Sequence, residues 1–261
     1  MRTRPTGPFD QMVVEAIPSR VVLHVGFHCT QMDAAHAFVR QNRMIVRRHA
    51  QFVLDHQLKP AVAAARGYSE NPDPFNRQRF QFRFISLLGE VQAHEKRPLL
   101  ISHPGLLGHM PGAGGVKSYA AAPDLCEDMV DGVHQVFRSE VEVLLLFTRC
   151  APAEWLDLSW QRLTKNEMTE HGANEHANRF AQAADLVGVV ETVRDRISGA
   201  DVQDHEVTSL ADAAFGVGGI YIDALRLPPR SFEKIKGPEG SAPAAEGASM
   251  ATLMEPYRTP R

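Results

Sequence analysis

The sequence predicts an α/β protein with a mostly parallel central sheet flanked by helices. Three apolar runs, residues 20–25, 97–102 and 140–149, have the composition of strands that are covered on both faces. Segments with a helical spacing of apolar residues lie between these runs. Strands that alternate with helices favour a parallel sheet, and such sheets bind ligands at the carboxyl ends of their strands.

The composition is that of a globular protein and excludes several classes of function. The chain has 261 residues, of which 44% are hydrophobic and 23% charged, enough for one substantial core. A net charge of −3 gives no reason to expect a nucleic-acid or anionic-membrane surface. The longest apolar run is far too short to span a bilayer, and no apolar signal segment follows the N-terminus. The 3 cysteines suggest neither disulfides nor a metal site, so we expect a cytoplasmic protein.

The first half of the chain divides into a lead-in, two strands and two helical stretches. Residues 1–18 are polar and contain proline, which is typical of a loosely held lead-in. After the strand at 20–25, the turn at 26–33 leads into a helix for which Asp33 is a candidate N-cap. Near-helical spacing of apolar residues continues to positions 52 and 53. A turn-rich break at 67–76 then precedes a helix at about 77–95.

The second half begins with the strand at 97–102 and a long glycine-rich loop. The sequence then predicts a helix, the strongest strand, and a helix that has Pro152 in its first turn. Residues rich in Pro, Gly, Ala and Ser, 228–261, are expected to form a disordered tail after the domain at 19–227. The helices predicted in this half are at 124–137, 151–165, 173–183, 185–198 and 218–226, and a weak strand is predicted at about 201–207.

Three stretches of the chain resemble the sulfotransferases that use 3′-phosphoadenosine 5′-phosphosulfate (PAPS). The stretch "LHVGFHCTQMDAAHAFV" matches the bacterial pattern "LHIGxHKTGTTxLQxFL" on both sides of the phosphate loop. The stretches "LLISHPGLLGHMPG" and "LLLFTRCAPAEWLDLSWQRL" are similar to the segments that follow two later strands in that family. The resemblance covers residues 19–227 and implies a three-layer, P-loop-type α/β fold.

The resemblance also implies a donor site at the first loop. In the family, backbone N–H groups and a helix N-terminus hold the 5′-phosphosulfate, and a loop lysine offsets charge that develops during sulfuryl transfer. That lysine falls on Cys29, the following threonine is kept as Thr30, and the family's glycine falls on Gln31. Gly26 and His28 complete the expected loop contacts.

The loop departs from the family at the positions that carry its chemistry. Cys29 supplies no fixed cation, and Gln31 would be strained wherever the turn requires a positive φ. The family's two hydroxyl positions fall on Met32 and Asp33. A carboxylate there repels phosphate by about 1 kcal/mol at 4 Å in water and by several times that near a protein surface. The family's way of binding PAPS is therefore not expected here.

The part of the implied donor site that would hold the 3′-phosphate keeps one of its two expected residues. Arg149 matches the arginine that holds the 3′-phosphate, a contact that is strong when it is bidentate. The family's serine lies 8 residues further on, where this chain has Asp157, and Ser159 lies 10 residues on. His103, with His109 behind it in the same loop, is the candidate base for an acceptor hydroxyl.

Each candidate also has a purely structural interpretation. The turn at 26–33 could be an inherited strand-to-helix connection, His28 could bond to backbone, and Arg149 could form an ion pair. Trp155, Leu156 and Trp160 are most simply packing residues. Other chemistries lack their motifs: a cysteine phosphatase needs an arginine where Ala35 stands, and no Gly-Lys-Ser/Thr loop is present. A zinc site is disfavoured because the side chains of His24 and Cys29 would point to opposite sides of a strand, and no metal is expected.

Two functions from different classes follow. The first is sulfuryl transfer from PAPS to a hydroxyl or amine of a small-molecule or glycan acceptor, with Lys117 or Lys165 replacing the lost loop lysine. The second is a non-catalytic protein that keeps the fold and binds another ligand or a protein partner. Family resemblance favours the first, and the chemistry of the loop favours the second.

Overall fold

Five parallel strands in the order β2-β3-β1-β4-β5 form one sheet, which confirms the prediction of an α/β protein with a mostly parallel sheet. The computed structural model describes residues 16–91, 93, 96–238 and 250–258. Most of the predicted lead-in, residues 1–15, therefore lies outside the described residues. The strands are β1 (Arg20–His24), β2 (Gln51–Leu54), β3 (Leu99–Ser102), β4 (Glu142–Arg149) and β5 (Asp201–Glu206).

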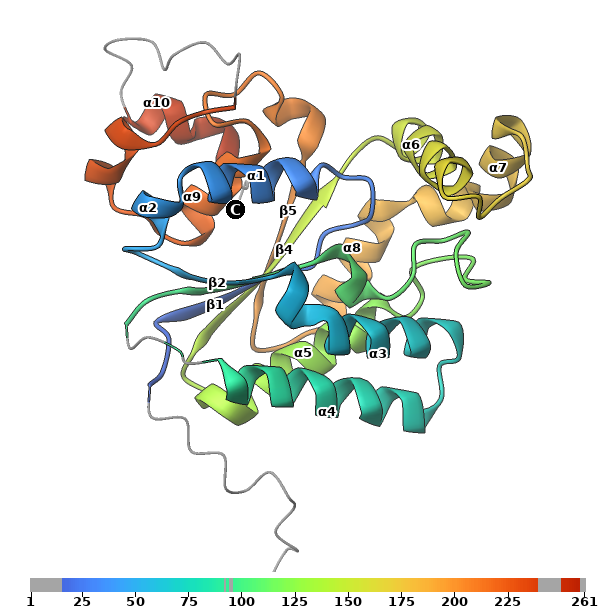
Figure 1. Ribbon diagram of the computed structural model, residues 1–261, viewed down its shortest axis with the longest axis horizontal. Helices are drawn as coiled ribbons and strands as arrows, with labels where there is room; N and C mark the ends of the chain where they lie inside the picture. Colours follow the sequence, from blue (N-terminus) through green and yellow to red (C-terminus); the bar gives the residue numbers. More distant parts are fainter. Residues whose placement is uncertain (1–15, 92, 94–95, 239–249, 259–261) are drawn as a thin grey trace, which may run out of the picture.

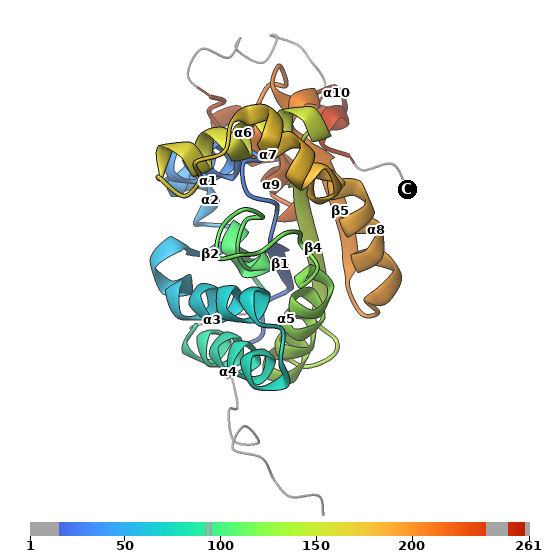
Figure 2. The same cartoon turned by 90° about the vertical axis from the view of Figure 1, so that its right-hand side faces the viewer.

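Helices cover both faces of the sheet and make a three-layer α/β fold that is consistent with a P-loop-like architecture (Figures 1 and 2). On one face lie α3 (Lys59–Glu70), α4 (Pro74–Glu90), α5 (Ala122–Phe137) and α8 (Leu186–Arg196). On the other lie α1 (Met32–Gln41), α2 (Arg43–Val46), α9 (Ile220–Ala224) and α10 (Met250–Met254). Beyond the ends of the strands lie α6 (Pro152–Lys165) and α7 (Ala173–Phe180).

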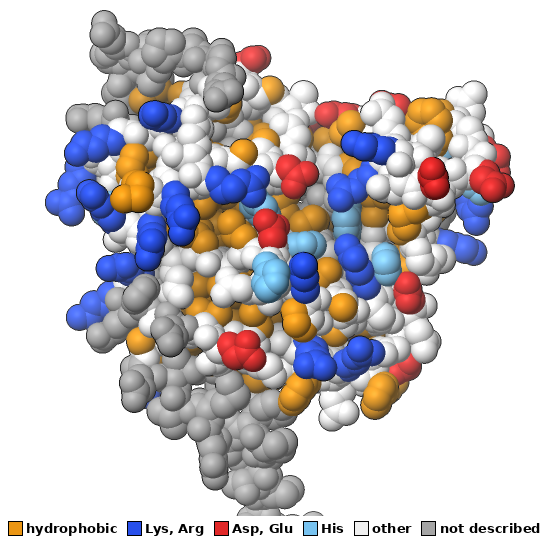
Figure 3. Space-filling view, in the orientation of Figure 1, with side chains coloured by type: hydrophobic (Ala, Val, Ile, Leu, Met, Phe, Trp, Pro, Cys, Tyr) orange, Lys and Arg blue, Asp and Glu red, His pale blue; other side chains and the backbone are white. Residues whose placement is uncertain are grey.

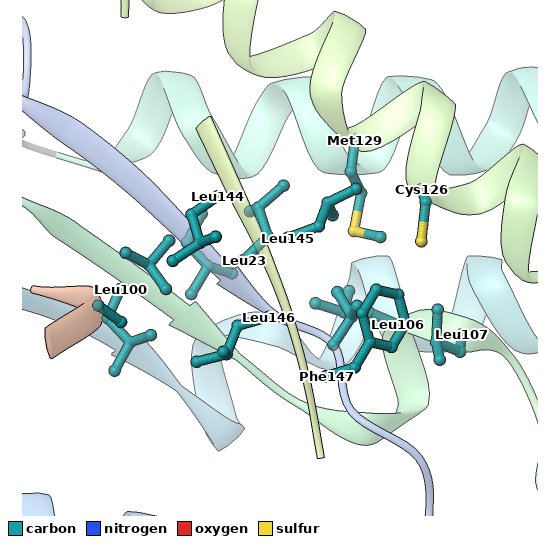
Figure 4. Close-up of a cluster of buried hydrophobic side chains, with 14 of the residues drawn as sticks. Leu23, Leu100, Leu106, Leu107, Cys126, Met129, Leu144, Leu145, Leu146 and Phe147 are labelled. Atoms are coloured by element: carbon teal, nitrogen blue, oxygen red, sulfur yellow. The ribbon is translucent and has the colours of Figure 1, made fainter. Parts of the chain in front are cut away.

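The core forms where the apolar strands meet the helix layers (Figure 4). Residues Leu144 to Phe147 of β4 are fully buried, as a central strand of a parallel sheet requires. They lie close to Cys126 and Met129 of α5 and to the short 3-10 helix η2 (Pro104–Leu107). Within the described residues, no helix combines the length and apolar character needed to cross a membrane.

Three consecutive elements, β2, α3 and α4, differ from the prediction. Phe52 and Val53 continue the helical spacing in the sequence, but they lie in β2, which pairs with β3 from Gln51 to Leu54. Four residues are too few to show a strand period, so only the pairing with β3 identifies them. The alanine-rich helix α3, which packs on α4, has no counterpart in the prediction. The predicted helix at 77–95 begins earlier, at Pro74, where the Asp73 side chain caps it.

The start of α1 also differs from the prediction. Gln31 is the N-cap residue, in a left-handed conformation with φ 56°, and no side chain caps the helix. Asp33 lies in the first turn instead, so its carboxylate still faces the positive end of the helix dipole. It does not perform the capping role that the sequence suggests.

The predicted tail includes residues that pack on the domain. Tyr257 is fully buried, and its hydroxyl accepts a hydrogen bond from the Phe215 backbone N–H at 2.9 Å. Its ring lies in contact range of the Phe215 ring and against Gly219, where an added Cβ would come within 2.2 Å of it. Residues 250–258 thus differ from the expected disorder, because one aromatic residue anchors a segment of low-complexity composition.

Replacing Tyr257 with phenylalanine is expected to lower the free energy of unfolding by about 1–3 kcal/mol, because the buried Phe215 N–H loses its acceptor. Urea denaturation of the variant measures this loss. Glu255→Gln, an exposed change in the same turn, is the matched control. Equal stability of the wild type and Tyr257→Phe would contradict the packing of this segment.

Candidate functional site

Three segments meet at the carboxyl ends of the neighbouring strands β3, β1 and β4, the carboxyl edge of the sheet. They are the turn after β1, the loop after β3 and Arg149 at the end of β4. Figure 3 shows histidine side chains among Lys and Arg on this side of the molecule, in a band between α1 and α3. The convergence agrees with the sequence prediction for a parallel sheet.

The turn after β1 is close to the sheet and conformationally strained. A Cβ at Gly26 would lie 2.6 Å from the Thr148 hydroxyl oxygen, so this position requires glycine. Cys29 and Gln31 adopt positive φ values of 66° and 56°. Non-glycine residues in this region cost about 1–2 kcal/mol each. Gln31 therefore has the strain expected from the sequence.

Thr30 faces the sheet. Its side chain is buried, and its hydroxyl donates to the Phe27 carbonyl at 2.6 Å and lies 2.8 Å from the Thr148 hydroxyl. Both contacts are internal to the fold. The one threonine that the loop shares with the sulfotransferase pattern thus holds the turn against β4.

Cys29 is half-buried and lies beside Arg162 of α6. Burial raises the pKa of the thiol, and the nearby guanidinium of Arg162 opposes this only in part. The thiol therefore stays protonated at neutral pH and is a poor nucleophile. Arg162 brings a cation to the position where the resemblance implies the family's lysine. Of the two residues proposed for this role, Lys117 lines a pocket together with Arg179 and Phe180 of α7, and Lys165 is exposed at the C-terminal end of α6.

His28 is a structural residue of the turn. Its ring Nδ1 lies 3.2 Å from the Tyr119 hydroxyl, and its carbonyl accepts from the Trp155 indole N–H at 3.0 Å. Burial, with smaller contributions from Arg162 and Arg66, lowers the pKa of His28 to about 3. The ring is neutral at physiological pH, in line with the structural interpretation of this residue.

The geometry of His103 does not suit a general base. Its Nδ1 accepts a hydrogen bond from the Gly105 backbone N–H at 2.9 Å. Burial lowers the pKa of His103, so the ring is neutral and the second nitrogen, Nε2, carries the proton. This tautomer can donate to a ligand but cannot take a proton at Nε2. His109, the alternative base, lies 3.0 Å from the Glu70 carboxylate.

Arg149 is neutralised by two carboxylates of the neighbouring strand. Its guanidinium lies 2.6 Å from Asp204 and 2.8 Å from Glu206, both on β5. Burial alone would lower the pKa of Arg149, but these hydrogen bonds raise it. A 3′-phosphate would have to approach two carboxylates that already satisfy the arginine, so this environment does not fit the phosphate.

Ser159 is also engaged within the fold. It is fully buried, and its hydroxyl donates to the Leu156 carbonyl at 3.0 Å and lies 2.9 Å from His176 Nε2 on α7. Asp157, at the family's serine position, accepts from Gln161 on the exposed side of α6. Both side chains are therefore engaged by other residues of the fold.

A polar network, buried except for the exposed Asp55, lies at the carboxyl ends of β1 and β3. His36 Nδ1 is 3.8 Å from Asp55, and His36 Nε2 is 2.8 Å from the Ser102 hydroxyl. The order of acid, histidine and serine resembles a hydrolytic triad, and the sequence did not reveal it. However, Ser102 is 0% exposed and also bonds to His24 and Tyr221, so no substrate could reach its hydroxyl. The network ties β1 and β3 together and does not form a hydrolase site.

Two cations that the sequence prediction missed, Arg66 and Arg162, flank the carboxyl edge. Arg66 on α3 lowers the pKa of His103 and His109, in each case less than burial does. Both arginines are exposed, and neither forms an ion pair with a carboxylate among the described residues. Arg162 had one sequence signal, its place three residues after Ser159 on the same helix. Arg66 had none, since α3 was not predicted.

Comparison with models of protein families, with curated proteins and with solved structures gave no match.

Proposed function

We propose that this protein is a binding module that holds one anionic group, a phosphate, sulfate or carboxylate, at the carboxyl edge. The observation that carries the proposal is the position of Arg162. This exposed cation lies beside the Cys29 sulfur in the strand-to-helix turn that follows β1. Arg66 of α3 adds a second positive charge that, like that of Arg162, acts on His28. Helix α1 directs its positive end to the same turn.

The surroundings of Arg149 support a binding role in place of PAPS chemistry. Asp204 and Glu206 already pair with this arginine. A 3′-phosphate on the ligand should therefore not increase its affinity. His103, in its Nε2–H tautomer, is suited to donate a hydrogen bond to an anion. The exposed carboxylate of Asp33 opposes anion binding, so its removal should strengthen binding.

Tryptophan fluorescence can test the proposal locally, because both tryptophans of the chain, Trp155 and Trp160, lie on α6 beside the site. Titration with adenosine 5′-phosphate and with adenosine 3′,5′-bisphosphate is expected to give similar affinities. Arg162→Ala should lower the affinity for both nucleotides about tenfold or more, because it removes a charged hydrogen bond worth about 1.5–3 kcal/mol. Asp33→Asn should strengthen both, and Lys165→Ala, an exposed change on the same helix, is the matched control.

Sulfuryl transfer from PAPS is the second candidate, favoured by the same position of Arg162. It predicts that the 3′,5′-bisphosphate binds at least tenfold more tightly than the 5′-phosphate and that Arg149→Ala abolishes the difference. That result would replace the binding role with the transferase. No binding of either nucleotide to the wild type at millimolar concentration would refute both.

A further inference from the structure

A pocket of about 370 Å³ opens at the amino ends of β2 and β3. This is the edge of the sheet opposite to Arg162 and the turn after β1. Gln51 and Leu99 are paired there at the start of the two parallel strands. The lining residues are Arg43, Arg47, Ala50, Gln51, Phe52 and Arg97, which we call the arginine pocket.

Three guanidinium groups surround the arginine pocket without a neutralising carboxylate. Arg43, Arg47 and Arg97 are exposed, and among the described residues none of them forms an ion pair. Many other arginines of the chain do form such pairs: Arg20, Arg40, Arg77, Arg149, Arg194, Arg196 and Arg226. Unpaired like charges around one cavity repel each other, and an anion bound between them would relieve that repulsion.

The positive charge extends beyond the pocket walls. The pKa of His49, which follows α2, is lowered by burial and then by the charges of Arg230, Arg48 and Arg97. Figure 3 shows Lys and Arg side chains gathered on the flank of the molecule where α2 lies. This concentration is local, since the whole chain has a net charge of −3.

Phe52 adds a chemical preference to the charge. Phe52 is half-buried and lines the pocket, although it also packs against the core. An aromatic surface beside guanidinium groups suits a flat ring that carries an anion, because the ring can stack while the arginines bind phosphate in a bidentate way. The volume is in the range of small-ligand sites.

We propose that the arginine pocket binds a phosphate monoester attached to a planar ring, with Arg43, Arg47 and Arg97 on the phosphate and Phe52 on the ring. The site is separate from the carboxyl edge. Its concave form favours a small molecule over a nucleic acid, which binds along extended basic surfaces.

The test is a calorimetric titration with phenyl phosphate and with inorganic phosphate, carried out in the Arg162→Ala background so that the carboxyl edge does not contribute. Phenyl phosphate is expected to bind more tightly than inorganic phosphate. Adding Arg47→Ala or Arg97→Ala should lower the affinity for phenyl phosphate at least tenfold. Phe52→Leu keeps an apolar side chain at this position. Adding it should lower the affinity for phenyl phosphate to that for inorganic phosphate.

Arg79→Ala, which removes an exposed arginine of α4 that does not line the pocket, is the matched control and should leave the affinity unchanged. An equal loss in this variant, or no binding at millimolar phenyl phosphate, would overturn the proposal. Tighter binding of a single-stranded oligonucleotide that depends on Arg48 and Arg230 as strongly as on Arg47 would also overturn it in favour of a nucleic-acid surface. Since Arg162 is absent throughout, these outcomes are independent of the function proposed for the carboxyl edge.

Discussion

Replacing Trp155 with alanine is expected to lower the free energy of unfolding by about 3–5 kcal/mol, the usual loss for a large buried aromatic side chain. Trp155 is 0% exposed, and its ring lies edge-on to Tyr119 with centroids 6.1 Å apart. Its indole N–H is also a hydrogen-bond donor to the His28 carbonyl. The substitution removes this bond and leaves a cavity beneath the turn after β1.

Urea denaturation followed by circular dichroism measures the loss. Trp155→Phe helps to separate the two contributions, because it keeps much of the ring volume but lacks the donor to His28. We expect it to cost about 1–3 kcal/mol, the penalty for a buried carbonyl without its partner. A loss below about 1 kcal/mol in Trp155→Ala would mean that the turn does not depend on α6.

The second large effect is a loss of stability in mild acid. In the folded protein, burial holds the pKa of His28 at about 3 and the pKa of His24 well below the ordinary value of 6.5. Well above pH 6.5 both rings are neutral in the folded and the unfolded chain, so they do not make stability depend on pH. Below it, the unfolded chain binds protons that the folded chain cannot, and stability falls by about 1.4 kcal/mol per pH unit for each histidine.

Chemical denaturation at several pH values between 4.5 and 6.5 measures this slope, in a range above the ordinary pKa of the carboxylates. His28→Gln should reduce the slope by about one proton, because glutamine does not titrate. His56→Gln, at an exposed histidine, is the matched control. An unchanged slope in His28→Gln would contradict a buried, neutral His28.

The fold class was accessible from the sequence because its signals are local. The buried strands β1, β3 and β4 are continuous apolar runs in a chain that alternates strand and helix, and this pattern alone predicts a parallel sheet. Where local signals were short, the prediction failed: β2 has four residues, and its assignment depends on pairing with β3.

Arg149 shows why the candidate site was only partly predictable. Its position at the end of β4 follows from the sequence, but its charge partners belong to β5, 55 and 57 residues away. One signal was present: Asp204 and Glu206 are two residues apart on a strand, so they share a face. Only the pairing of β5 with β4, in which Arg149 lies opposite Glu206, shows that this face meets the arginine.

By itself, the sequence determined the strands β1, β3 and β4, most helices and the absence of a lysine from the turn at 26–33, because each depends on neighbouring residues or on a single side chain. Only the tertiary structure decided which charges meet. It neutralised Arg149, brought Arg162 to Cys29, and gathered Arg43, Arg47 and Arg97 around one pocket. Electrostatic interactions depend on distances between residues far apart in the chain. The packing of α3 and α6 and the pairing of β5 with β4 determine those distances.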